Sequence, residues 1–166
     1  MNGSPGGRMR LLLVEDDPGD VVLARESLGS LLVTLDLDVV EDGTEALAFL
    51  RREGNYRHAR RPDLILLDLN LPRKDGWEVL GSIKSDALLK AIPVVVLTTS
   101  KSDGDIRRAY ELGANCFITK PPGLSEYESA IRRLGDFWLS VARIPESTVP
   151  HMNKDPAAGA DHRSTP

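Results

Sequence analysis

The clearest structural signal in this chain is the segment Asp63-Leu64-Ile65-Leu66-Leu67-Asp68, which has four apolar residues in a row and ends in a carboxylate. A second segment, Leu11-Leu12-Leu13-Val14, ends in the same way at Glu15-Asp16-Asp17. Strands that are apolar at every position are typical of a parallel sheet buried on both faces. Since ligands bind at the carboxyl edge of such sheets, we expect these acids to gather at a binding site there.

The composition is that of an ordinary globular protein, with 166 residues, 41% hydrophobic and 28% charged. A chain of this length has room for one domain of about 100–150 residues. The net charge of −4 argues against a nucleic-acid partner. A single cysteine, Cys116, excludes an internal disulfide, and no secretory signal or long apolar stretch is present. We therefore expect a cytoplasmic protein with no membrane association.

Glycine and proline mark both ends of the chain, which predicts a flexible N-terminus at 1–9 and a flexible C-terminal tail at 146–166. The single domain then covers 10–145. Within it, apolar runs predict strands at 10–15, 35–40, 63–68, 93–98 and 115–119. Apolar residues at helical spacing predict helices from Asp17-Pro18 onward and at about 44–53, 76–86, 102–113 and 125–143.

Several helix ends carry recognisable signals. Asp17 before Pro18 predicts an N-cap followed by proline at the first helical position. Gly54 is the predicted stop of the second helix, and Ser102 is the predicted cap of the fourth. Ser125, with glutamate three residues later, predicts a capping box at the start of the last helix.

Five strands alternating with five helices predict a doubly wound α/β fold with a parallel sheet. In the flavodoxin-like order 2-1-3-4-5 the first and third strands are neighbours at the point where the order reverses. That arrangement would place Glu15 and Asp16 beside Asp68.

Such a cluster suits phosphoryl chemistry. Carboxylate oxygens without a soft ligand nearby favour Mg²⁺, and an aspartate beside the ion can attack phosphorus to form an acyl phosphate. The other phosphoryl oxygens then need a hydroxyl and a cation. Thr98 and Lys120 supply these groups at the ends of the fourth and fifth strands.

The same residues resemble the receiver domain of two-component response regulators over about 10–143. The resemblance is carried by the following motifs: Leu13-Val14-Glu15-Asp16-Asp17, Leu66-Leu67-Asp68-Leu69-Asn70-Leu71-Pro72, Asp75-Gly76, Leu97-Thr98-Thr99-Ser100 and Thr119-Lys120-Pro121. It implies that Asp68 is the phosphoacceptor and that a histidine kinase is the phosphoryl donor. It also implies chemistry limited to autophosphorylation and autodephosphorylation, with no turnover of other substrates.

The resemblance further implies a role for each matching position. Asp16 would bind magnesium directly, Glu15 mainly through water, and Asn70 through its backbone carbonyl, with Asp68 completing the set. Thr98 and Lys120 would contact the phosphoryl group, and Phe117 would move with Thr98. Asn70 and Ser100 would tune the lifetime of the acyl phosphate, and the Lys120–Pro121 peptide bond would be cis.

Three details resemble the single-domain regulators paired with bacterial phytochrome histidine kinases. These are the signature from Asp68 to Trp77, the Leu-Thr-Thr-Ser segment at 97–100, and a last helix that ends at Ile144-Pro145. They imply a bacteriophytochrome as the partner kinase. Val22 and Leu23, outside the predicted apolar stripe of the first helix, are expected to contribute to kinase docking.

The last helix also predicts a homodimer. Tyr127, Ile131, Leu134, Trp138 and Val141 follow the spacing of a core stripe. Phe137 is turned from Trp138 by roughly 100° and falls outside a narrow stripe. Phe137, Trp138 and Tyr110 of the fourth helix are therefore candidates for an interface that includes the fifth strand. The alternative is a wide core stripe covered by the tail.

Two other functions are consistent with an acidic edge. A magnesium-dependent phosphatase of the haloacid dehalogenase type would use the same nucleophile, but its general acid would normally be an aspartate at the position of Asn70. A phosphorylation-independent binding module would be expected to lack Asp68, Thr98 or Lys120. We therefore expect a single-domain response regulator that acts by binding other proteins.

Overall fold

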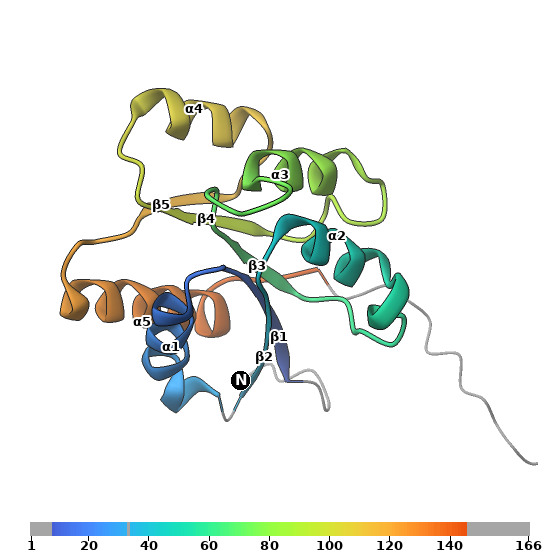
Figure 1. The fold of residues 1–166 in the computed structure, drawn as a ribbon. Helices are drawn as coiled ribbons and strands as arrows, with labels where there is room; N and C mark the ends of the chain where they lie inside the picture. Colours follow the sequence, from blue (N-terminus) through green and yellow to red (C-terminus); the bar gives the residue numbers. More distant parts are fainter. Residues whose placement is uncertain (1–7, 33, 146–166) are drawn as a thin grey trace, which may run out of the picture.

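Five parallel strands form one sheet in the order β2-β1-β3-β4-β5 (Figure 1). The computed structural model describes residues 8–32 and 34–145. The strands are β1 (Met9–Val14), β2 (Leu35–Val40), β3 (Leu64–Leu67), β4 (Val94–Thr98) and β5 (Cys116–Thr119). The predicted flavodoxin-like order is thus confirmed, and each strand lies within about two residues of its predicted position.

Helices cover both faces of this sheet. They are α1 (Pro18–Ser27), α2 (Gly43–Arg51), α3 (Gly76–Ser85), α4 (Asp103–Glu111) and α5 (Leu124–Ser140), with short 3-10 turns η1 (Gly29–Leu31) and η2 (Gly54–Tyr56). Figure 1 shows α1 and α5 on one face and α2, α3 and α4 on the other. No helix within 8–32 and 34–145 is long and apolar enough to cross a membrane.

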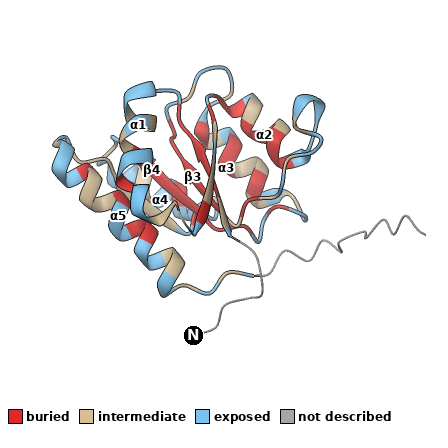
Figure 2. Ribbon diagram, turned by 90° about the horizontal axis from the view of Figure 1, so that it is seen from below, coloured by how far each residue is buried: buried red, intermediate tan, exposed pale blue. Residues whose placement is uncertain are grey.

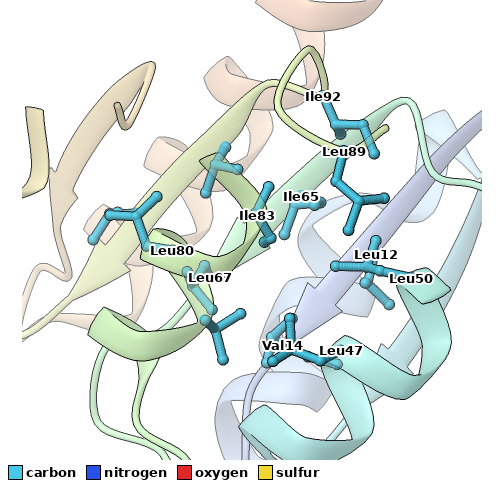
Figure 3. Packing of buried hydrophobic residues seen from close by; sticks show 14 of the residues in the cluster. Leu12, Val14, Leu47, Leu50, Ile65, Leu67, Leu80, Ile83, Leu89 and Ile92 are labelled. Atoms are coloured by element: carbon cyan, nitrogen blue, oxygen red, sulfur yellow. The ribbon is translucent and has the colours of Figure 1, made fainter. Parts of the chain in front are cut away.

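Two apolar layers explain why the central strands are hydrophobic at every position. Leu12, Val14, Ile65 and Leu67 point toward α2 and α3, where they meet side chains such as Leu47 and Ile83 (Figure 3). The alternate residues, among them Leu13 and Leu66, pack toward α1 and α5. Figure 2 shows the resulting band of buried strands between partly exposed helices. The sheet that carries the carboxyl edge is therefore held rigidly from both sides.

Most of the predicted helix ends are confirmed. The Asp17 carboxylate accepts hydrogen bonds from the backbone N–H groups of Gly19 and Asp20, and the Ser102 hydroxyl accepts one from Asp105. α4 is followed by Gly113 with a φ of +101°. These caps hold the first turns of α1 and α4 at the carboxyl edge of the sheet.

Two helix ends differ from the prediction. α2 stops at Arg52, which takes the left-handed conformation with a φ of 58° while Glu53 N–H donates to Ala48. Gly54 therefore does not end α2; it begins the 3-10 turn η2. α5 starts at Leu124 with Gly123 as its N-cap, so the Ser125 capping box is wrong. Ser125 is already helical, and its hydroxyl contacts the adjacent Glu126 instead of a backbone N–H.

The apolar stripe of α5 is shorter than predicted. Tyr127, Ile131 and Leu134 are buried and Trp138 packs against them, but Val141 is 68% exposed. Val141 lies outside the core because the helix ends at Ser140. The segments predicted to be flexible, apart from Arg8 and Met9, lie outside the described residues, so the predicted domain limits stay predictions.

Candidate functional site

The register of the sheet brings the predicted site residues together. Val14 pairs with Leu67 across β1 and β3, and the Asp68 N–H donates to the Val14 carbonyl at 3.0 Å. Glu15 and Asp68 directly follow these paired residues, so they lie side by side at the ends of two adjacent strands. On the other side of β3, the Lys120 N–H donates to the Thr98 carbonyl at 2.7 Å. Four strands thus bring a polar residue, at their last position or directly after it, to one edge of the sheet.

Glu15, Asp16 and Asp68 form an acidic cluster at this edge. Each offers one carboxylate oxygen, and these oxygens all lie within 4.8 Å of one another. Glu15 and Asp68 are buried, whereas Asp16 is exposed. Carboxylates this close repel one another unless a cation lies among them, and an all-oxygen ligand set suits a hard divalent ion. The residues present therefore fit the predicted metal.

Lys120 lies inside the same group of acids. Its Nζ donates to Glu15 Oε2 at 2.7 Å, to Asp20 Oδ2 at 2.7 Å and to Asp68 Oδ2 at 3.1 Å. An ammonium has three N–H donors, so all of them are used. Asp20, in the first turn of α1, was missed by the sequence reasoning. The available signal was its place at the start of a helix that begins at the carboxyl edge.

Burial and charge shift the pKa values in this cluster. Desolvation is the main cause that raises the pKa of Glu15 to about 7, against the hydrogen bond from Lys120 that lowers it. Burial alone would lower the pKa of Lys120, but its hydrogen bonds to Asp20 and Glu15 outweigh burial and raise the pKa above the ordinary value. Lys120 therefore remains a cation at neutral pH.

Thr98 provides the most informative polar atom of the site. Its side chain is 1% exposed, and among the described residues Oγ1 has no hydrogen-bond partner. Buried hydroxyls nearly always have a partner, so an unpartnered one calls for an explanation. Thr98 ends β4, between the strands that lead to Asp68 and Lys120. Its hydroxyl is therefore available to an oxygen atom of a ligand at this edge.

A hollow of about 260 Å³ opens beside Lys120. Its lining consists of Asp20, Thr99, Lys101, Lys120, Pro121, Pro122 and Tyr127. Burial, together with the charge of Asp20, raises the pKa of the Tyr127 hydroxyl, so this group stays protonated. The sequence did not predict that Thr99, Lys101 and Tyr127 would line a hollow beside Lys120, because their approach to it depends on how the loops and α5 pack.

The remaining predicted residues lie around this centre. Asn70 is exposed, and its backbone N–H donates to Asp68 Oδ1 at 3.0 Å. The Ser100 hydroxyl donates to Asp105 at 2.6 Å, so it is held toward α4. Phe117 is half-buried against the core.

The Lys120–Pro121 peptide bond is trans, so the expectation of a cis bond is wrong for this structure.

The residues predicted to contact a second copy or a kinase lie on different helices. Tyr110 on α4 and Phe137 on α5 are each about half exposed, and the two helices lie on opposite faces of the sheet (Figure 1). The Tyr110 hydroxyl also accepts a hydrogen bond from the Phe117 N–H at 3.2 Å. Phe137 packs edge-on against Trp138 with 5.5 Å between ring centroids. On α1, Val22 is exposed as expected, whereas Leu23 packs against the core.

Comparisons with known proteins agree with this geometry. Residues 11–132 match the family described as the response regulator receiver domain. Response regulator Rcp1 from Synechocystis sp. is 45% identical over 135 residues, which span 81% of this chain and 92% of the relative.

Two solved structures show the same fold. The phosphorylated cyanobacterial phytochrome response regulator RcpA superposes with a TM-score of 0.81 at 50% identity, covering 84% of this chain and 99% of the other. The Mn²⁺-bound form of Rcp1 superposes with a TM-score of 0.80 at 44% identity, covering 82% and 99%. One relative is thus phosphorylated and the other binds a divalent metal.

Proposed function

The chain belongs to the response regulator receiver domain family, and on that premise we propose that Asp68 accepts a phosphoryl group from a histidine kinase. The observation that carries this assignment is the buried Thr98 hydroxyl, which has no hydrogen-bond partner in the described part of the chain and lies at the same edge as the ion pair of Asp68 with Lys120. Together these groups offer one nucleophile, one cation and one free hydroxyl. Those are the parts that a phosphoryl group in transfer requires.

The proposed reaction exchanges one bond for another. An Asp68 carboxylate oxygen attacks phosphorus in a phosphohistidine, an O–P bond forms, and the N–P bond breaks. The histidine nitrogen keeps the electron pair and takes up a proton. Lys120 and Thr98 hold the phosphoryl oxygens through their Nζ and Oγ1 atoms, while the buried position of Asp68 limits access by water.

Magnesium is the proposed cofactor. Asp16 and Asp68 would hold it directly, Glu15 mainly through water, and Asn70 through its backbone carbonyl. The acidic cluster and the Mn²⁺-bound relative support this set. When bound, the ion neutralises charge on the carboxylates and the phosphoryl oxygens.

The proposed donor is a bacteriophytochrome histidine kinase, because RcpA is a phytochrome response regulator and half of its aligned residues are identical. The chain would then act in signalling through protein–protein contacts. The test is phosphotransfer from purified, radiolabelled histidine kinases of the source organism. We expect one kinase to transfer label within seconds and the others far more slowly. Failure of every kinase to transfer label would contradict the proposed function.

Asn70 and Ser100 are proposed to set the lifetime of the acyl phosphate. They lie two residues after Asp68 and Thr98, which end or directly follow β3 and β4 at the carboxyl edge of the sheet. We expect Asn70→Ala with Ser100→Ala to speed the decay of phosphorylated protein by at least about threefold, because smaller side chains leave phosphorus more open to water. Most of the effect should come from Asn70, since Asp105 holds Ser100 aside.

Loss of label over time measures this decay. Ser85→Ala, at an exposed position on α3, is the matched control and should decay like the wild type. Magnesium affinity should be similar in all variants, since neither side chain belongs to the acidic cluster. An unchanged decay rate in the double variant would remove both positions from the lifetime role.

The α4-β5-α5 face, defined by Tyr110, β5, Phe137 and Trp138, is the proposed homodimer interface. Phe137 is a large aromatic side chain that is 49% exposed, and such anchors dominate interface energies. We expect Phe137→Glu to weaken dimerisation by at least about tenfold, because a charge would be buried against the partner copy. The sedimentation coefficient over a range of protein concentrations measures this change.

Leu88→Glu is the control for the dimer. Leu88 is 71% exposed but belongs to the α3–β4 connection, so its variant should sediment as the wild type does. Phosphorylation adds negative charge near Thr98 and should alter the dimer affinity through Phe117. A wild-type protein that is monomeric both with and without a phosphoryl analogue would contradict the interface.

A further inference from the structure

We propose that Asp20 is a positioning residue that holds the Lys120 ammonium in place for phosphoryl transfer to Asp68. The inference rests on the proposed function and adds to it a side chain outside the family motifs quoted above. It concerns where a cation is placed, and it adds no bond-making step to the reaction.

The contact is short, with a buried ammonium and a partly exposed carboxylate. Asp20 Oδ2 lies 2.7 Å from Lys120 Nζ, which is closer than the 3.1 Å between Nζ and Asp68 Oδ2. The Lys120 side chain is 8% exposed. A buried ammonium needs an acceptor for each N–H group, and here Asp20 is one of only three found among the described residues. Asp20 therefore limits the positions that the ammonium can adopt.

The three carboxylates that accept from Lys120 differ in whether they also belong to the acidic cluster. Glu15 and Asp68 also belong to the acidic cluster with Asp16, whereas Asp20 does not. A divalent cation in that cluster would compete with Lys120 for the oxygens of Glu15 and Asp68. Asp20 would then be the carboxylate that still accepts a hydrogen bond from Lys120. Its carboxylate thus determines where the ammonium lies when a phosphoryl group arrives.

The backbone of Asp20 gives this acceptor a fixed position. Asp20 lies in the first turn of α1, and its N–H donates to the Asp17 carboxylate at 3.1 Å. Helix N-termini stabilise carboxylates, so the negative charge is favoured there. α1 packs against α5, which starts soon after Lys120, and both helices rest on the same face of the sheet (Figure 1). The pair therefore joins two well-anchored parts of the fold.

Two substitutions separate charge from shape. Asp20→Asn keeps the size of the side chain and removes its charge. Asp20→Glu keeps the charge, and its extra methylene can extend into the adjoining hollow of about 260 Å³. We expect Asp20→Asn to lower the rate of Asp68 labelling by acetyl phosphate and magnesium by at least about fivefold, and Asp20→Glu to recover at least about half of the lost rate.

A double-mutant cycle tests whether the effect passes through Lys120. In a Lys120→Met background, Asp20→Asn should change the rate by less than about twofold, because the partner is already gone. Calorimetric titration with magnesium alone measures the dissociation constant of the metal. Asp20→Asn should change this constant by less than about threefold, since Asp20 lies outside the metal cluster. Asp103→Asn, which removes an exposed acid from the first turn of α4, should behave as the wild type.

Each outcome bears on a different claim. If the wild type is labelled and Asp20→Asn is labelled at the same rate, the positioning role is wrong and the proposed function stands. An equal loss in the Lys120→Met background also overturns the role, because Asp20 would then act on the site only through its general charge. If the wild type takes no label, the proposed function fails and this inference fails with it.

Discussion

Asp68→Asn should take up at least about a hundredfold less phosphoryl label than the wild type from acetyl phosphate and magnesium, because an amide oxygen is a far weaker nucleophile than a carboxylate. The substitution is nearly isosteric, so the hydrogen bond from the Asn70 N–H to the side-chain oxygen can persist. The loss should therefore reflect chemistry and not folding. Intact-mass measurement followed by peptide mapping locates the phosphoryl group.

Removal of the metal should have a comparable effect. A chelator leaves Glu15, Asp16 and Asp68 with their mutual repulsion, offset within the described part of the chain by the ion pairs of Lys120 with Glu15 and Asp68. Asp63→Asn is the matched control, because Asp63 accepts from the Arg10 N–H at the opposite end of β3. A modified Asp68→Asn protein, or equal labelling of the wild type in chelator, would overturn the assignment of Asp68.

Gly76→Ala should destabilise the protein by about 1–3 kcal/mol, the range of an overpacked core position with a forced backbone shift. A Cβ atom on Gly76 would lie 2.3 Å from the Asp68 carbonyl oxygen and 2.4 Å from Leu69 Cα. Both are backbone atoms, so no side-chain rotation can relieve the contact. The Gly76 N–H also donates to the Leu69 carbonyl at 3.0 Å. The substitution should therefore displace Asp68 and slow its phosphorylation as well.

The midpoint of urea unfolding measures this change. Gly81→Ala supplies a control in the same helix, because nothing lies within 4 Å of a Cβ at Gly81. Alanine should stabilise that position by about 0.5–1 kcal/mol through helix propensity. Equal midpoints for Gly76→Ala and the wild type would show that the loop after β3 can shift at little cost.

Much of this molecule could be read from local patterns. Each central strand is a continuous apolar run, and each run ends at a polar residue that the parallel topology carries to one edge. Glu15, Asp68, Thr98 and Lys120 could therefore be predicted to meet, because each immediately follows or ends a strand. Caps such as Asp17 and Ser102 were equally predictable, since a cap acts on N–H groups two or three residues away.

The contacts between elements could not be obtained in this way. Asp20 reaches Lys120 across 100 residues of sequence, and Ser100 turns to Asp105 and not to the phosphoryl position. Gly76 lies against the backbone of Asp68 only because α3 folds back on the loop after β3. Periodicity and capping signals describe one element at a time. Which side chains meet between elements depends on the rotation and packing of the helices on the sheet, and these follow from the whole core at once.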